Sequence, residues 1–251
     1  MVGGDAGMGG TRVHRHPTRP EGGPAVTPVG IVTGASRGLG LALSRALAER
    51  GWRLVVDARG ADALERAVAR LAGVVTVPGD VTDPAHRAAL VEAAGERIDL
   101  LVSNAGLLGP SPRPALAAYP LSELARVYEV NVFAPLALLQ EALPRLAPGA
   151  AVLSISSDAA VEPYAGWGGY GSSKAALEQL TAIFAIEQPQ LRVYCVDPGD
   201  MRTRTYQEAF PGDDIADLPR PEASVPGLLA LIEGSLPSGR YRARELVGVA
   251  A

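Results

Sequence analysis

Short apolar runs that do not alternate with polar residues recur along this chain, and segments with helical spacing separate them. Six such runs cover residues 29–33, 53–56, 74–77, 98–102, 150–155 and 191–196. Strands that are apolar at every position have both faces buried, and parallel strands connected by helices have this pattern. The sequence therefore predicts one α/β domain of three layers, with a doubly wound parallel sheet between two layers of helices.

The helices are expected between these runs and after the last of them. They are predicted at residues 41–50, 62–71, from Asp83 onward, 121–146, 172–186 and 222–233. Pro135 and Pro144 should kink or end the fourth of these helices, because proline lacks an N–H group and clashes with the preceding turn. A last strand at residues 241–249 is expected only at the sheet edge, since arginines alternate through its start.

The composition supports a single domain with a tail in front of it. The chain has 251 residues, of which 47% are hydrophobic, and residues 28–251 are predicted to form the domain. Residues 1–27 are rich in glycine and proline and contain no apolar segment, which predicts a flexible tail rather than a secretory signal. Without such a signal or disulfides, a cytoplasmic protein is expected.

Charge and residue counts exclude several classes of function. The net charge is −4 with both signs interspersed, so no basic surface for nucleic acid is expected, and no run is long enough to span a membrane. The lone cysteine, Cys195, permits neither an internal disulfide nor a zinc site and is expected in the core. Beyond the tail, the only histidine is His86, predicted on a helix surface, which disfavours a Ser-His-Asp hydrolase.

A glycine-rich turn follows the first apolar run. Gly34-Ala-Ser-Arg-Gly-Leu-Gly40 lies between the predicted first strand and first helix. In this arrangement backbone N–H groups and the helix N-terminus can bind phosphate. The context of the turn therefore favours a nucleotide-binding site over a turn that only reverses the chain.

A second cluster of chemically useful residues lies between residues 156 and 174. Tyr170 and Lys174 are four residues apart, so on a helix they share one face. An ammonium near a phenol is expected to lower the phenol pKa, and Ser156 or Ser157 could bind the oxygen on which the phenol acts. Such a group could transfer a proton to or from a carbonyl or alcohol oxygen, although the pair alone could be an ordinary surface neighbour pair.

Several motifs together resemble the short-chain dehydrogenase/reductase family, in its compact branch. They are the glycine turn, Asn104-Ala-Gly106, Asn131, Ser157, Tyr170 with Lys174, and Pro198-Gly199 with Thr203. The resemblance covers roughly residues 29–203. It implies a Rossmann-like fold and an NAD(P)-dependent oxidoreductase that interconverts a carbonyl and an alcohol by hydride transfer.

The resemblance also implies roles for the catalytic candidates. Tyr170 would be the general acid or base, Lys174 would lower its pKa and bind the nicotinamide ribose, Ser157 would orient the substrate oxygen, and Asn131 would hold a water linked to Lys174. Ser156 stays the alternative serine. Structural roles remain open: Asn131 could satisfy buried backbone groups, and Thr203 could cap a helix.

The same resemblance implies a set of cofactor-binding residues. They are Gly34, Ser36, Arg37, Gly38, Leu39, Gly40, Arg59, Asp80, Val81, Asn104, Ala105, Gly106, Tyr170, Lys174, Pro198, Gly199 and Thr203. Arg59 follows the second strand where an arginine would pair with the 2′-phosphate of NADP, and Arg37 is a second cation for it. NADP(H) is therefore predicted over NAD(H). Asp57 complicates this prediction, because it lies one position before Ala58, where NAD-preferring members of the family often carry an aspartate.

Two predictions concern partners. A small-molecule carbonyl or alcohol is expected as substrate, and a homodimer or homotetramer as the assembly.

The alternative function is a non-catalytic nucleotide-binding regulator or scaffold on the same fold, because a fold alone does not establish catalysis. A pure binder would not need the set Asn131, Ser157, Tyr170 and Lys174.

Overall fold

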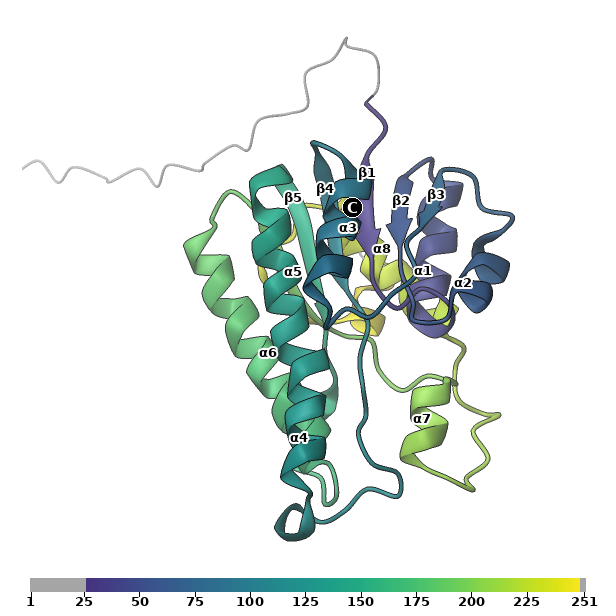
Figure 1. Ribbon diagram of the computed structural model, residues 1–251, viewed down its shortest axis with the longest axis vertical. Helices are drawn as coiled ribbons and strands as arrows, with labels where there is room; N and C mark the ends of the chain where they lie inside the picture. Colours follow the sequence, from purple (N-terminus) through teal and green to yellow (C-terminus); the bar gives the residue numbers. More distant parts are fainter. Residues whose placement is uncertain (1–25, 249–251) are drawn as a thin grey trace, which may run out of the picture.

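The computed structural model describes residues 26–248, which form a seven-stranded parallel sheet with helices on both faces (Figure 1). The strands are β1 (Val29–Val32), β2 (Arg53–Val56), β3 (Val74–Thr76), β4 (Ile98–Ser103), β5 (Leu146–Ile155), β6 (Arg192–Asp197) and β7 (Gly239–Arg242). Their order is β3-β2-β1-β4-β5-β6-β7. The connections therefore change direction between β1 and β4, where open parallel sheets have a crevice at the carboxyl ends of the strands.

The helices form the two outer layers. They are α1 (Gly38–Glu49), α2 (Ala61–Val68), α3 (Pro84–Ala94), α4 (Leu121–Tyr128), α5 (Ala134–Ala142), α6 (Gly168–Glu187), α7 (Arg204–Ala209) and α8 (Val225–Glu233). Residues of α1, α2 and α8 pack in the hydrophobic cluster on one face of the sheet. Residues of α3, α5 and α6 pack in the cluster on the other face.

The unalternated strands explain these two clusters. Adjacent residues on one strand point to opposite faces. Leu100 therefore belongs to the cluster under α1 and α8, whereas Leu101 belongs to the cluster under α3 and α5, and both are fully buried. Each such leucine contributes about 1.5–3 kcal/mol by burial. The predicted three-layer domain is confirmed.

The long helix predicted at residues 121–146 is divided as its prolines require. α4 passes into one π-helical turn, Glu129–Phe133, before α5 begins. Pro135 has no N–H group to donate to the carbonyl of Asn131, which removes one α-helical bond and favours the wider turn. α5 ends at Ala142, two residues before Pro144.

The C-terminal part corrects three boundaries. β5 begins at Leu146 rather than at residue 150, and α6 begins at Gly168 rather than at residue 172. β7 is an edge strand, as predicted, but it is shorter and earlier than residues 241–249 and pairs in parallel with β6. The short helix α7 had no prediction, because its six residues give too little pattern to recognise.

Three further predictions concern the N-terminal tail, the position of Cys195 and membrane-spanning segments. Residues 1–25 of the predicted tail lie outside the described residues. Cys195 is buried in β6 as predicted, and burial raises the pKa of its thiol to about 12. In the part of the chain that the structure describes, no helix combines the length and the apolar character that a bilayer crossing requires.

Candidate active site

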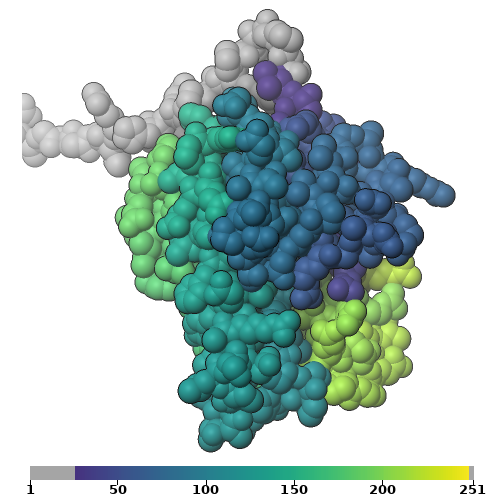
Figure 2. Space-filling model, in the orientation of Figure 1, coloured from purple at the N-terminus to yellow at the C-terminus, as the bar shows by residue number. Residues whose placement is uncertain are grey.

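A cavity of about 1140 Å³ opens at the carboxyl ends of the strands. The glycine turn after β1 lines one end, and aromatic side chains before α6 and on α7 line the other. In Figure 2, the teal segment around α4 and the yellow-green segment around α7 form the lower part of the molecule, beside the blue N-terminal half. We call the two ends the cofactor end and the substrate end.

The glycine turn is held tightly against the end of β4. Gly34 has φ +69°, a region that favours glycine. The side-chain amide of Asn104 donates hydrogen bonds to the carbonyls of Thr33 (2.8 Å) and Gly34 (3.2 Å). A Cβ atom at Gly40 would lie 2.5 Å from Asn104 Nδ2 and from the carbonyl oxygen of Gly34. Only glycine therefore fits this part of the turn.

The N-terminus of α1 is free to bind an anion. Arg37 precedes it without a capping hydrogen bond from its side chain. The N-terminus of α3 differs, because the carboxylate of Asp83 accepts the backbone N–H of Ala85 there. Free N–H groups and the helix dipole suit a phosphate. The glycine turn and the backbone N–H groups at the start of α1 therefore fit the pyrophosphate of a dinucleotide.

Asp57 and His86 form a buried pair beneath the turn. Asp57 Oδ1 accepts the backbone N–H of Gly34 (2.7 Å), and His86 Nε2 lies 3.0 Å from Asp57 Oδ2. Asp57 is 1% exposed and His86 is 7% exposed. The prediction of His86 on a helix surface is wrong, because its ring points inward from α3 to the end of β2. The Asp57 carboxylate is occupied by these two partners.

Arginine and aspartate side chains border the outer part of the cofactor end. Arg37, Arg59, Asp80 and Val81 all line the cavity. Partial burial would raise the pKa of Asp80, but hydrogen bonds from the backbone and hydroxyl groups of Thr82 hold this pKa below its usual value. Two cations and one well-fixed carboxylate thus face the space beside the turn.

Tyr170 and Lys174 lie on α6 and both line the cavity, as their spacing predicts. Lys174 Nζ is 5.5 Å from the centroid of the Tyr170 ring and donates a 2.7 Å hydrogen bond to the carbonyl of Ile155. Burial lowers the pKa of Lys174 to about 8. Burial, together with Asp158 and Asp197, raises the pKa of the Tyr170 phenol.

The expected lowering of the phenol pKa is therefore not found in this structure. Desolvation is the largest cause of the raised pKa of the Tyr170 phenol, and the Lys174 ammonium is directed to a backbone carbonyl at the end of β5. A raised pKa keeps the phenol protonated near neutral pH. A protonated phenol is a proton donor, so the present geometry suits the acid role.

The two serines after β5 differ in their bonding. The Ser156 hydroxyl is buried and donates to Glu178 Oε1 (2.6 Å) on α6. The Ser157 hydroxyl donates to Asp158 Oδ1 (2.8 Å) and is only half-buried at the cavity wall. Of the two hydroxyls, that of Ser157 is the one that a ligand in the cavity can approach.

Asn131 lies behind the cavity wall in the π-helical turn. It is fully buried, accepts the backbone N–H of Leu107 (2.8 Å), and donates to the Leu107 carbonyl and to Ser173 Oγ. A Cβ atom at Gly106 would be 3.5 Å from Asn131 Oδ1 and 3.8 Å from Lys174 Nζ. Asn131 lies close to Lys174 and satisfies buried backbone groups, which is the structural role that the sequence left open.

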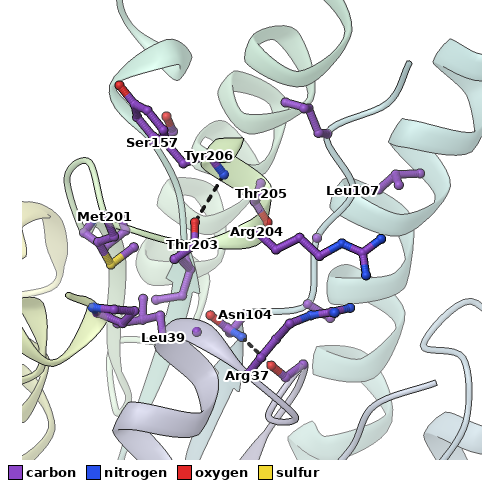
Figure 3. A pocket seen from close by; sticks show the side chains of 18 of the residues that line it. Arg37, Leu39, Asn104, Leu107, Ser157, Met201, Thr203, Arg204, Thr205 and Tyr206 are labelled. Carbon is purple, nitrogen blue, oxygen red and sulfur yellow. Dashed lines mark hydrogen bonds between the residues drawn. The ribbon is translucent and has the colours of Figure 1, made fainter. Parts of the chain in front are cut away.

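The remaining predicted residues meet at the same cavity. Thr203 caps α7 by accepting the backbone N–H of Tyr206 (3.2 Å), and Figure 3 shows this bond facing Arg37 and Asn104 from the other side of the site. Two predicted residues, Gly40 and Asn131, do not line the cavity. Those that do are Gly34, Ser36, Arg37, Gly38, Leu39, Arg59, Asp80, Val81, Asn104, Ala105, Gly106, Ser157, Tyr170, Lys174, Pro198, Gly199 and Thr203.

The substrate end contains an aromatic cluster with one arginine, and no motif in the sequence identifies this group. The rings of Trp167 and Phe210 lie 5.9 Å apart by centroid, and Trp167 is 5.8 Å from Tyr170. Arg113, from the segment between β4 and α4, lies over both Trp167 and Phe210. These residues are far apart in the sequence and share no motif spacing, so only the fold brings them together.

Comparison with known proteins decides the family. Residues 28–214 match the short chain dehydrogenase family. This chain belongs to the short-chain dehydrogenase/reductase family. It is therefore an oxidoreductase of a family that acts on CH–OH and C=O groups with a nicotinamide cofactor, which favours the enzyme over the regulator or scaffold.

Individual relatives are similar over most of their length. The chain is 33% identical over 193 residues to a benzil reductase ((S)-benzoin forming) of Saccharomyces cerevisiae, covering 71% of this chain and 73% of that protein. It is 32% identical over 242 residues to a rhamnolipids biosynthesis 3-oxoacyl-[acyl-carrier-protein] reductase of Pseudomonas aeruginosa, covering 88% and 87%. A solved short-chain dehydrogenase from Shigella flexneri complexed with NADP has a TM-score of 0.80 at 26% identity, covering 86% and 97%.

Proposed function

We propose that this short-chain dehydrogenase/reductase is an NADP(H)-dependent carbonyl reductase and alcohol dehydrogenase in which Tyr170 is the general acid and base. The observation that supports this most strongly is the position of Tyr170 and Lys174 in the same cavity as the glycine turn and its two arginines. The bound nicotinamide would supply or accept the hydride. The protein's part is to hold the substrate and to move the proton.

Tyr170 would donate its phenolic proton to the oxygen of the carbonyl as that oxygen gains negative charge. The raised pKa of this phenol keeps the proton available at neutral pH. Ser157 would donate a hydrogen bond to the same oxygen after turning from Asp158, which it now contacts. In alcohol oxidation the same groups would act in the opposite direction, with the phenolate as base.

Lys174 and Asn131 would support this proton transfer. The Lys174 ammonium, held at the Ile155 carbonyl, would bind the ribose of the cofactor and stabilise a Tyr170 phenolate when it forms. Asn131 fixes the backbone of Leu107 and the hydroxyl of Ser173, which lies directly before Lys174. Asn131 would therefore keep α6 in place against the segment after β4, in addition to any water that it holds.

The preference for NADP(H) is supported by the surroundings of Asp57. Its carboxylate is 1% exposed, and each of its oxygens already has a partner, in Gly34 or His86, so little of it is accessible to a ribose hydroxyl. Arg37 and Arg59 line the cavity and would pair with a 2′-phosphate. Relatives solved with NADP and NADPH are consistent with this choice.

The assembly, location and domain bounds of the enzyme are proposed as the sequence predicts them. Phe133, at 54% exposure before α5, and Ile186, at 82% on α6, are apolar side chains on the two helices through which a homodimer or homotetramer is proposed. A cytoplasmic location is retained, as is the assignment of residues 28–251 to one domain. Light scattering of the purified chain would measure the assembly.

Tyr170→Phe tests the function most specifically. This variant keeps the ring and its contacts with Trp167 but removes the only phenolic proton that the mechanism uses. We expect turnover of a ketone to fall by about 10²–10⁴-fold, with NADPH affinity nearly unchanged. Tyr164→Phe, which removes the exposed hydroxyl that donates to Asp158, is the matched control and should retain most of the activity. Full activity of Tyr170→Phe would contradict the proposal.

A further inference from the structure

Arg113 lies between two aromatic rings at the substrate end of the cavity. Its guanidinium carbon is 4.1 Å from the centroid of the Trp167 ring and 4.7 Å from that of Phe210. The two rings cover parts of the guanidinium surface by cation–π contact. The in-plane N–H groups are then the part of the side chain that remains to bind another group.

These N–H groups are not satisfied by the protein. Nη1 of Arg113 is buried and has no hydrogen-bond partner among residues 26–248. Burial lowers the pKa of this guanidinium, and Tyr206 partly opposes that shift. Among the described residues, its Nη1 atom has no carboxylate within hydrogen-bond distance. A buried donor without a partner costs free energy, which a ligand that accepts the hydrogen bond would recover.

Arg87 shows how this chain satisfies a buried arginine that has a structural role. Its guanidinium is bonded to Glu141 Oε1 (3.0 Å) and to the backbone carbonyls of Val81 and Thr82. Arg113 has no comparable set of partners. The difference points to a partner for Arg113 that comes from outside the chain.

The position of Arg113 relative to Tyr170 defines the shape of that partner. The Trp167 ring lies 5.8 Å from the Tyr170 ring and 4.1 Å from the Arg113 guanidinium carbon, so the phenol and the guanidinium are both neighbours of the same indole. The acidic side chain beside the phenol, Asp158, is bonded to Ser157 and Tyr164. A negative group on the substrate would therefore be repelled near Tyr170 and attracted at Arg113.

We infer that the substrate is a carbonyl compound with a carboxylate a few atoms from the carbonyl, which Arg113 binds while the rings of Trp167 and Phe210 contact its apolar body. This inference rests on the proposed function, because it places the carbonyl at Tyr170. It adds the charge of the substrate and the residue that selects it.

The alternative explanation is that Arg113 has a structural role only and holds α7 against the rest of the domain. The segment before Arg113 is already tied to α7, since Ser111 Oγ donates to the carbonyl of Glu208 (2.7 Å). With a purely structural role, loss of Arg113 would weaken the binding of charged and uncharged ligands equally. A binding role would affect only the charged ligand, and this difference can be measured.

The test is ligand binding followed by tryptophan fluorescence, because Trp167 contacts Arg113 and the chain has only 2 tryptophans. The probes are 4-phenylbutanoate and 4-phenylbutanamide, which have nearly the same shape, differ in net charge and contain no reducible carbonyl, each titrated with and without saturating NADP⁺. We expect the wild type to bind the carboxylate about 10- to 100-fold more tightly than the amide. In Arg113→Met the two should bind alike, with the affinity for the amide within about threefold of wild type.

Arg204→Gln is the matched control. Arg204 also lines the cavity, but its guanidinium is exposed and paired with Glu208 (2.6 Å), so the carboxylate-to-amide ratio should stay as in wild type. Equal binding of the two probes by the wild type would overturn the inference. Equal weakening of both probes in Arg113→Met would also overturn the inference, because a purely structural role of Arg113 predicts that result.

Turnover of 4-oxo-4-phenylbutanoate and of its amide with NADPH separates this inference from the proposed function. Reduction of both ketones at similar kcat/KM would contradict the inference and leave the function intact. Carboxylate-selective binding without reduction of any ketone would contradict the function and leave the anion site intact.

Discussion

The two ends of the cavity are built in different ways. At the cofactor end, backbone atoms and buried side chains at the ends of β1, β2 and β4 are joined by short hydrogen bonds, such as those from Gly34 to Asp57 and from Asn104 to Thr33. At the substrate end, half-exposed side chains from three separate segments meet through ring contacts, as at Arg113 and Phe210. The first end suits one unvarying ligand, and the second can change without loss of the fold.

This difference predicts that changes at the cofactor end alter cofactor binding and leave the substrate KM nearly unchanged. Substitutions of Gly40, Arg59 and His86 test that separation.

Gly40→Ala should have the largest effect on cofactor affinity. The new Cβ would lie 2.5 Å from the Gly34 carbonyl, so the turn must move. We expect NADPH affinity, measured by fluorescence titration, to fall about tenfold or more, with a lower melting temperature. Gly239→Ala on β7, where the nearest atom is 3.7 Å away, is the control. Unchanged affinity would show that the turn is less tightly packed than described.

Arg59→Ala should weaken NADPH binding by about tenfold, since it removes one charged hydrogen bond to the 2′-phosphate. NADH binding should not change, because NADH lacks that phosphate. Arg66→Ala, on the exposed side of α2, serves as the control. If both cofactors weakened equally, Arg59 would have a structural role rather than the proposed one.

The pH dependence of kcat/KM should report Lys174. Its pKa is lowered by burial to about 8, so its ammonium is present below that pH and is lost as the pH rises through it. We therefore expect ketone reduction to decline above about pH 8 in the free enzyme. In Lys174→Arg the guanidinium stays charged, and this decline should move to higher pH. A wild-type profile that is flat through this range would exclude Lys174 as the titrating group.

His86→Leu should have the smallest effect, a loss of about three- to fivefold in NADPH affinity with an unchanged ketone KM. The change removes the partner of Asp57 Oδ2 and frees the carboxylate that holds Gly34. His86→Asn can still donate a hydrogen bond and should lose less. A change in ketone KM that equals the change in NADPH affinity would break the separation between the two ends.

The sequence was sufficient to predict the sheet and the position of the glycine turn, because both follow local rules. Apolar strands, the Asp83 cap and the glycine turn are each specified within a few neighbouring residues. His86 was placed wrongly because its contact with Asp57 joins residues 29 positions apart, and helical spacing does not report such a contact. Arg113 was missed for the same reason, since its position depends on a loop and on α7 together.

Ser157 and Asn131 show an intermediate case. The family resemblance favoured Ser157 over Ser156, and only the fold shows that the hydroxyl of Ser156 is bonded to Glu178. Asn131 was expected in a helix, but its π-helical turn follows from Pro135 four residues later. The resemblance therefore proposed both residues, and three-dimensional packing determined the contacts that each side chain makes.

The most direct test of the account is the ratio of kcat/KM for NADPH to that for NADH in the wild-type enzyme. It would be measured by cofactor absorbance with a panel of ketones, quinones, imines and alcohols. We predict reduction of a ketone with a preference for NADPH of about tenfold or more, because Arg37 and Arg59 face the cavity and Asp57 is buried. No turnover of any carbonyl, or a clear preference for NADH, would contradict it.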